Sequence, residues 1–182
     1  MRFSYRTQQW LPYPVVQVFD FFASPHNLPL LMPEWQRARI DTLALVAAPP
    51  RPATSGSMSA AAGIGTRFTL SFVPFPHCPV RIRWQAEIDD FKWDEYFCDR
   101  QLRGPFAYWN HRHIVRGFHQ PGYSGTVVAD EVEYEMPFGV AGRLAHRLLV
   151  RRQIERSFSL RQGELARILF GVKSQLRPQG EQ

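Results

Sequence analysis

Residues that could do chemistry gather in two stretches of alternating polarity in the second half of the chain. The first, FCDRQLRGPFAYWNHRHIV, places Trp109, His111 and His113 two residues apart, and the second, TVVADEVEYEMPFG, carries Asp130 and Tyr134. Successive side chains of a strand point to opposite faces, so Trp109, His111 and His113 share one face. An imidazole beside a carboxylate can accept or release a proton near neutral pH, which would suit acid–base chemistry.

The other face of the second stretch is acidic and fixes which face is inside. Glu131, Glu133 and Glu135 alternate along it and require solvent. Asn110 and Arg112 on the first stretch would complement them across an antiparallel pair. The histidines and the aspartate therefore point inward. Buried polar groups need partners, so the inward set predicts either a closed hydrogen-bond network or a polar spot inside a binding cavity.

Three interpretations of this polar set differ in chemistry. The candidate catalytic residues are His111, His113, Asp130 and Tyr134. The two histidines could also be a metal pair, but no third or fourth ligand with convincing spacing accompanies them, so no metal and no cofactor is predicted. A structural hydrogen-bond network is the favoured interpretation, because buried polar groups usually satisfy one another.

Aromatic side chains could form the wall of the cavity by stacking and apolar burial, or they could fill the core. The two alternatives stay open. The predicted ligand-binding set is Trp84, Phe97, Trp109, His111, His113, Asp130, Tyr134, Phe68 and Phe72.

The elements that must position these residues follow from the periodicity of apolar residues. Strands are predicted over 3–11, 37–46, 67–72, 80–88, 96–102, 106–118 and 126–136, with two short helices after the first strand and a long helix over 140–170. This order predicts an α+β fold of the helix-grip type, in which a curved antiparallel sheet of six to seven strands wraps a long C-terminal helix and leaves a cavity between them.

Two segments are predicted to be mobile. Residues 47–65 are rich in Pro, Ser, Ala and Gly without periodicity, which suggests a mobile loop at the rim of the fold. Residues 1–172 are expected to form one domain, and 173–182 a flexible tail.

Composition limits the class of protein. The chain has 182 residues, 45% of them hydrophobic, and a formal net charge of +6, which indicates a globular domain that favours anionic partners. The arginines are not in a dense block, so no nucleic-acid binding is predicted. Two cysteines make neither a disulfide framework nor a metal motif. No run approaches the roughly 20 apolar residues of a membrane span, so we expect a cytoplasmic protein without stable membrane insertion.

Taken together, the early helix pair, FCDRQLRGPFAYWNHRH and DEVEYEMPFGVAGRLAHRLLVRRQIE resemble the SRPBCC superfamily, which includes START, pollen-allergen and polyketide cyclase-like helix-grip proteins. Within it, the chain is most similar to bacterial ligand-binding SRPBCC domains, some of which occur beside or fused to epimerase-like proteins. The resemblance implies binding of a hydrophobic small molecule and a possible epimerase-like protein partner.

Three functions are therefore expected, in decreasing order. The first is binding of a hydrophobic or amphipathic small molecule, such as a lipid, polyketide or aromatic compound, in the internal cavity. The second is a polyketide cyclase or dehydratase that uses the cavity His, Asp and Tyr residues. The third is a protein-interaction domain that docks through the arginines of the last helix, although a solvated face is the favoured interpretation of these side chains. The arginines are Arg143, Arg147, Arg151, Arg152, Arg156, Arg161 and Arg167.

Overall fold

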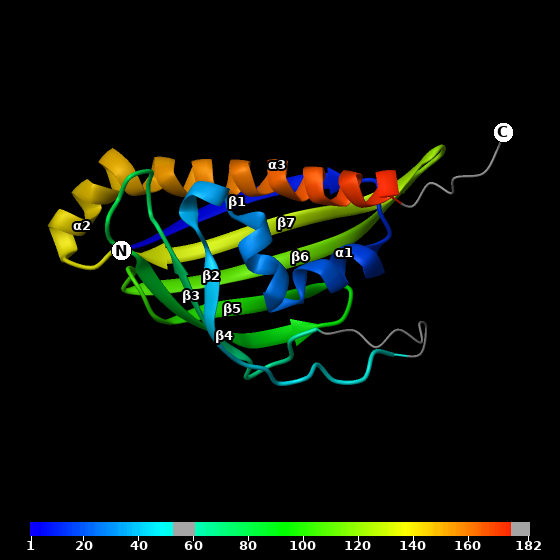
Figure 1. Ribbon diagram of the computed structural model, residues 1–182, viewed down its shortest axis with the longest axis horizontal. Helices are drawn as coiled ribbons and strands as arrows, with labels where there is room; N and C mark the ends of the chain where they lie inside the picture. The colour runs from blue at the N-terminus through cyan, green and yellow to red at the C-terminus, as the bar shows by residue number, and fades with distance from the viewer. Residues whose placement is uncertain (53–60, 176–182) are drawn as a thin grey trace.

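A computed structural model describes residues 1–52 and 61–175 and contains one antiparallel sheet with the strand order β1-β7-β6-β5-β4-β3-β2. The strands are β1 (Arg2–Leu11), β2 (Arg39–Ala44), β3 (Arg67–Phe72), β4 (Ile82–Lys92), β5 (Tyr96–Arg103), β6 (Tyr108–Gln120) and β7 (Tyr123–Glu135). Seven strands at the predicted places confirm the predicted α+β helix-grip fold, in which strands consecutive in sequence lie side by side from β2 to β7 (Figure 1).

The helical elements are α1 (Val15–Phe22), the 3-10 turns η1 (Pro25–Leu31) and η2 (Glu34–Gln36), and a C-terminal run made of α2 (Gly139–Ala145), the π turn η3 (His146–Val150) and α3 (Arg151–Gln175). Helices α1 and α3 and the turn η1 pack against the sheet. In Figure 1, α3 runs along the length of the sheet and α2 projects beyond its end. The helix continues through Gln175, so the first residues of the predicted tail are helical. Residues 176–182 lie outside the described part.

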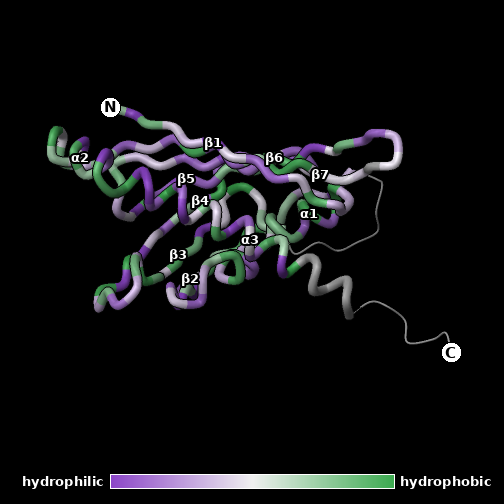
Figure 2. The backbone as a smooth tube through the Cα atoms, turned by 90° about the horizontal axis from the view of Figure 1, so that it is seen from above, coloured by the Kyte–Doolittle hydropathy of each residue, from purple (hydrophilic) through white to green (hydrophobic). Residues whose placement is uncertain are grey.

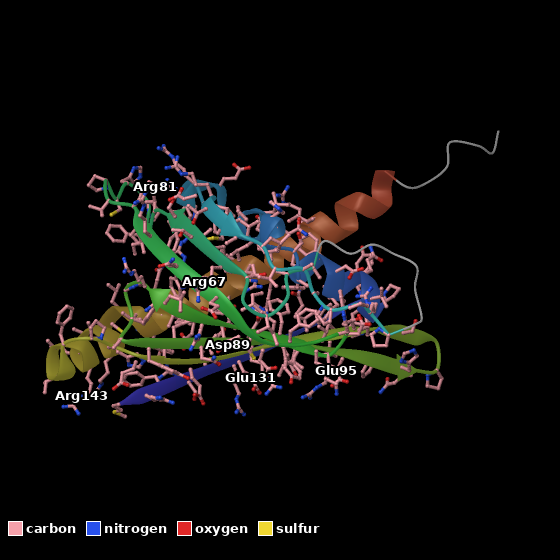
Figure 3. The ribbon with its side chains drawn as sticks, turned by 90° about the horizontal axis from the view of Figure 1, so that it is seen from below. Arg67, Arg81, Asp89, Glu95, Glu131 and Arg143 are labelled. Atoms are coloured by element: carbon pink, nitrogen blue, oxygen red, sulfur yellow. The ribbon has the colours of Figure 1, made fainter. Side chains whose placement is uncertain are left out.

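The alternation predicted for β6 and β7 is present. Trp109, His111, His113 and Val115 are buried, and the residues between them are only partly so. On the outer face, Glu131 lies 3.6 Å from Arg6 of β1. Figure 3 shows Glu131 on the side of the sheet away from α3 and Arg143 at the outside of α2. In Figure 2 both hydrophilic and hydrophobic residues occur along the strands.

Proline and glycine set the boundaries of the helices that cover the sheet. Pro14 precedes the first turn of α1, where its missing N–H costs nothing, and Val18 and Phe19 of that helix are fully buried. Between β7 and α2 the chain reverses so tightly that a Cβ on Gly142 would overlap the carbonyl oxygen of Pro137. Only glycine fits there, and this fixes the start of the C-terminal helix relative to the sheet.

The segment predicted as a mobile loop is anchored on both sides of residues 53–60, which lie outside the described part. Ala47 and Ala62 form an isolated bridge. The Arg51 guanidinium lies 2.7 Å from a carboxylate oxygen of Asp20 in α1 and 3.0 Å from one of Asp94, between β4 and β5. Its side chain is only 6% exposed. The described ends of this segment therefore hold α1 against the sheet, and mobility of the remainder stays a prediction.

Within the described residues, no helix is both long enough and apolar enough to cross a membrane.

Candidate functional site

Three adjacent strands bring two histidines and two aspartates together on the inner face of the sheet. Asp99 of β5 is the direct cross-strand partner of His111 on β6, and His113 is the direct partner of Asp130 on β7. His111, His113 and Asp130 are each 5% exposed. Directly paired residues have neighbouring Cβ atoms, so the register alone forces the four side chains into one cluster.

Hydrogen bonds close the cluster. His111 Nε2 lies 2.9 Å from Asp130 Oδ1, and His113 Nε2 lies 3.0 Å from Asp99 Oδ2. The Arg161 side chain of α3 reaches down to the same place, with one guanidinium nitrogen 3.4 Å from His113 Nδ1 and another 3.9 Å from Asp130 Oδ1. Helix α3 thus contributes a cation to a cluster otherwise built by the sheet.

Burial and neighbouring charges act oppositely on the carboxyl groups. Burial alone would raise the pKa of Asp130, but Arg161 and the hydrogen bonds from both histidines outweigh it and hold that pKa well below its usual range. For Asp99, burial is again outweighed, by the His113 hydrogen bond and the nearby positive charges, and the pKa is lowered. Burial lowers the pKa of His111 to about 4, with a contribution from His113. The site therefore holds two carboxylates and a neutral His111 at neutral pH.

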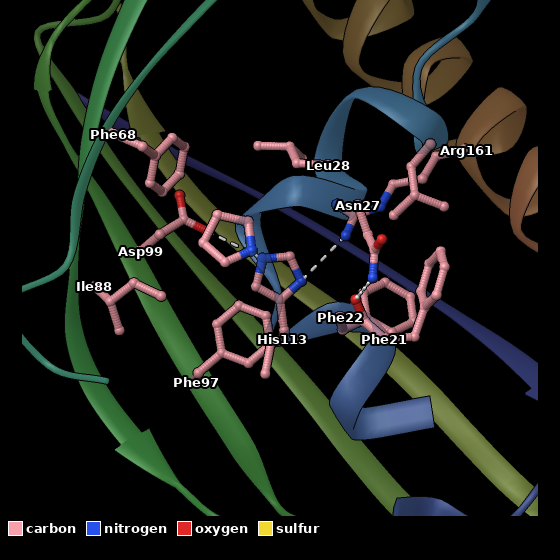
Figure 4. A pocket seen from close by; sticks show the side chains of 13 residues that line it. Phe21, Phe22, Asn27, Leu28, Phe68, Ile88, Phe97, Asp99, His113 and Arg161 are labelled. Atoms are coloured by element: carbon pink, nitrogen blue, oxygen red, sulfur yellow. Dashed lines mark hydrogen bonds and ion pairs between the residues drawn. The ribbon is translucent and has the colours of Figure 1, made fainter. Parts of the chain in front are cut away.

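A small recess, with about 40 Å³ of water-accessible space, lies over one side of this cluster. Its apolar lining comes from α1, η1 and the sheet, namely Phe21, Phe22, Leu28, Leu31, Phe68, Ile88 and Phe97. Its polar or charged lining includes Asp99, His113 and Arg161 (Figure 4). The geometry is that of an apolar pocket with a few convergent polar groups at one place, which is typical of small-molecule sites.

The predicted site residues separate into three groups. Phe68, Phe97 and His113 line the recess. His111 and Asp130 complete the polar cluster behind His113. The remaining four pack in two other hydrophobic clusters and are Trp84, Trp109, Tyr134 and Phe72.

Tyr134 makes its hydrogen bond to a residue outside the histidine–aspartate cluster. Its hydroxyl lies 2.9 Å from Nε2 of His146, whose ring stacks on Phe3 with ring centroids 3.6 Å apart. Trp84 and Trp109 meet edge to face at 4.8 Å. These rings pack against one another and against Ile154 and Phe158 of α3, so this end of the space between sheet and helix is filled by side chains. Their proposed contact with a ligand stays a prediction.

Two residues of the site were not among the predicted ones. Asp99 shares a strand face with Phe97, but both faces of β5 mix polar and apolar residues, so the sequence pattern does not show which face is inside. Arg161 was grouped with the solvated arginines, which is wrong for this residue, because its side chain is only 15% exposed. The signal was present, since Arg161 lies three residues after Phe158 and four before Leu165, on the buried stripe of the helix.

Comparison with known proteins agrees with the observed fold. The sequence model of a protein family described as polyketide cyclase / dehydrase and lipid transport matches residues 11–159. Among solved structures, the TTHA0849 protein of Thermus thermophilus is 18% identical, with a TM-score of 0.61 over 93% of this chain and 98% of that one. Norcoclaurine synthase from Thalictrum flavum is 12% identical, with a TM-score of 0.58 over 93% of this chain and 87% of that one. At these identities the likeness shows the fold alone.

A point mutant of the same synthase, in complex with a transition-state analogue, is 13% identical, with a TM-score of 0.59 over 95% of this chain and 97% of that one. No curated protein matches the sequence.

Proposed function

Because the chain belongs to the polyketide cyclase / dehydrase and lipid transport family, whose members bind hydrophobic molecules, we propose that it binds an amphipathic small molecule in the recess between α1, η1 and the sheet. The observation that carries this proposal is the composition of the recess. Aromatic and aliphatic side chains surround a polar place formed by Asp99, His113 and Arg161, with Asn27 as a further polar lining residue. Apolar burial would supply the affinity, at about 25 cal/mol per Å².

The polar place indicates which end of the ligand it receives. Among the described residues, Nε of Arg161 is buried and has no hydrogen-bond partner. A buried donor without a partner costs free energy, and a ligand oxygen would relieve that cost. The proposed ligand therefore has an apolar body and a hydrogen-bond acceptor at one end, such as a carbonyl or carboxylate oxygen of a lipid, polyketide or aromatic compound.

A pair of neighbouring leucines provides the test. Leu28 lines the recess, whereas Leu30 of the same turn is 53% exposed. Binding of fatty acids and aromatic ketones would be measured by calorimetry, after native mass spectrometry of freshly purified protein for any retained compound. Leu28→Trp fills the recess and should weaken binding at least about 10-fold, which is about 1.4 kcal/mol, while Leu30→Trp should bind like the original chain. Equal binding by both variants, or no retained compound and no binding from the panel, would overturn the proposal.

An enzyme of the cyclase or dehydratase type is the alternative function of the same recess. The contact between the polar cluster and the recess favours it, because a bound carbonyl compound would lie against His113 and Asp99. Turnover of a poly-β-carbonyl substrate mimic distinguishes the two. A carrier would bind the compound and return it unchanged, whereas an enzyme would convert it and lose conversion in His113→Ala.

A surface at the start of the C-terminal helix run, around α2, favours a second function. This function is docking on a membrane from which the ligand is drawn. Five large apolar side chains are exposed there, at 58–85%, in a stretch of twelve residues. They are Phe138, Val140, Leu144, Leu148 and Leu149. Arg143, Arg147, Arg151 and Arg152 border them, and the sequence has no acidic residue between Glu135 and Glu155. Apolar side chains bordered by cations fit an anionic lipid surface, which α2 can reach because it projects beyond the sheet (Figure 1).

Sedimentation with lipid vesicles tests this docking surface. The double variant Leu144→Gln/Leu148→Gln should lose binding to phosphatidylglycerol-containing vesicles, and added salt should weaken binding of the original chain. Leu45→Gln, at an exposed leucine far along the chain, is the control. Absence of vesicle binding together with a dimer that the double variant abolishes would reassign the surface to contact between two copies of the chain.

A further inference from the structure

The spacing of His111 and His113 gives no metal motif because the sequence offers no third ligand near them. The fold supplies one. Asp99 lies on the neighbouring strand, directly opposite His111, and Oδ2 of its carboxylate lies between the two imidazoles. One ligand atom from each of Asp99, His111 and His113 lies within 4.8 Å of the others.

The two imidazoles are oriented alike with respect to the two carboxylates. His111 Nδ1 and His113 Nε2 face Asp99 Oδ2, at 3.7 and 3.0 Å. The other nitrogens, His111 Nε2 and His113 Nδ1, face Asp130 Oδ1, at 2.9 and 3.1 Å. Rings that carry one proton each supply two N–H groups for these four contacts, and an Arg161 nitrogen lies 3.4 Å from His113 Nδ1. His111 Nδ1, 3.7 Å from Asp99 Oδ2, then makes no hydrogen bond within the cluster and keeps a lone pair for a further ligand.

We infer that Asp99 Oδ2, His111 Nδ1 and His113 Nε2 form a binding site for one divalent transition-metal ion, with Asp130 accepting hydrogen bonds from the far nitrogens of both histidines. A metal lies about 2.0–2.2 Å from nitrogen and oxygen ligands, so its ligand atoms are separated by roughly 3–3.5 Å. The two measured separations from Asp99 Oδ2 are close to that range.

The chemistry of the ligand set favours particular ions. Two imidazoles and one carboxylate suit Fe(II), Zn(II) or Co(II) better than Mg²⁺ or Ca²⁺, which prefer oxygen. Asp130 would act as the carboxylate that orients a metal-binding histidine, here for two histidines at once. Arg161 lies 3.9 Å from Asp130 and also contacts His113 Nδ1, so it stands beside the outer carboxylate and not among the three ligand atoms.

The remaining coordination positions would open toward the recess, because Asp99 and His113 line it and His111 lies behind. When the ion enters, it takes the place of the proton between His113 Nε2 and Asp99. The proton of His113 would move from Nε2 to Nδ1, toward Asp130 Oδ1 at 3.1 Å, and the Arg161 nitrogen that now faces Nδ1 would turn to Asp130. The ion would give up part of its bound water, and its two positive charges would be balanced by the two carboxylates. Metal binding at these three residues requires no apolar ligand, so failure to bind such a ligand would leave it unchanged.

Tag-free protein treated with a chelator and then titrated with Co(II) tests the site. We expect one ion per chain, visible absorption from nitrogen–oxygen coordination, and displacement by Zn(II). Asp99→Ala and His111→Ala should each weaken binding at least about 100-fold, and Asp130→Asn by about 10–100-fold. His119→Ala, at an exposed histidine, should have no effect.

Substitutions in a buried cluster can unfold a protein, so a second measurement uses the unsubstituted protein. Histidine ring ¹⁵N spectra recorded with and without Zn(II) should change for His111 and His113 and stay unchanged for the exposed His26, His77 and His119. Changes confined to the exposed histidines, or Co(II) binding that persists in folded Asp99→Ala, would overturn the inference. Absence of stoichiometric binding would do the same.

Discussion

Arg161 shows how a single residue of the closing helix can govern the buried cluster. Its guanidinium lies near Asp130 and His113 and 5.2 Å over the ring of Phe22, which belongs to the wall of the recess. It places a positive charge beside the buried carboxylate of Asp130. Arg161 therefore has two roles. It offsets negative charge in the cluster, and it attaches α3 to the sheet.

Removing Arg161 is expected to destabilise the protein far more than removing an arginine from the exposed face of the same helix. Arg161→Ala leaves Asp130 buried without its cation and should lower the free energy of unfolding by about 3 kcal/mol. Arg167→Ala breaks only an exposed pair with Glu164, with 70% of the arginine side chain exposed, and should cost less than about 1 kcal/mol. Urea denaturation of both variants gives the comparison. Equal losses would show that Arg161 contributes only surface charge.

The two cysteines are expected to differ in reactivity. Burial raises the pKa of the Cys98 thiol to about 12, so the reactive thiolate is almost absent at neutral pH. Cys78 is partly exposed. A disulfide reagent that reports released thiolate should therefore titrate one cysteine of the folded protein quickly, and mass spectrometry should locate the label on Cys78. Urea should release the second. Fast labelling of both in native buffer would contradict the burial of Cys98.

At the scale of elements, the period-two pattern of β6 and β7 was sufficient to predict which face of the sheet is buried. Glutamates on every second residue of β7 leave only one orientation that avoids burying charge. The same reasoning could not place Asp99, because polar and apolar residues occur on both faces of β5. It also could not divide the aromatic residues between recess and filled core, since that depends on how α1, η1 and α3 close over the sheet and not on the strand pattern.

Two glycines in the C-terminal run should respond oppositely to the same substitution. At Gly142 a Cβ would overlap the Pro137 carbonyl oxygen, so Gly142→Ala must move α2 away from the end of β7 and should destabilise by about 1–3 kcal/mol. At Gly163, in the middle of α3, a Cβ would meet no atom within 4 Å. Gly163→Ala should stabilise by about 0.5–1 kcal/mol, because alanine has the higher helix propensity. Thermal unfolding of the two variants measures both signs, and destabilisation at Gly163 would contradict the open surroundings seen there.

At the scale of the molecule, the recess exists because α1 and η1 are held at a fixed distance from the sheet. Arg51 provides much of that attachment. It connects Asp20 of α1 with Asp94 beyond the end of β4, and its guanidinium stacks 4.2 Å from the ring of Trp93. Phe21 and Phe22, which follow Asp20 directly, line the recess. A contact in a segment with no predicted structure thus positions the wall of the proposed binding site.

Arg51→Ala should therefore change both stability and binding. It leaves two partly buried carboxylates without their shared cation, and we expect a loss of about 3 kcal/mol together with faster proteolysis near residues 47–52, because the anchor on that side is gone. Ligand affinity should fall as well, since α1 is no longer held in place. Arg39→Ala, which removes an arginine with 67% of its side chain exposed in a pair with Asp41, is the matched control and should change neither property. If Arg51→Ala lost stability but bound the ligand unchanged, α1 would have to keep its place without this ion pair. The apolar packing of α1, which includes the buried Val18 and Phe19, would then hold the wall of the recess.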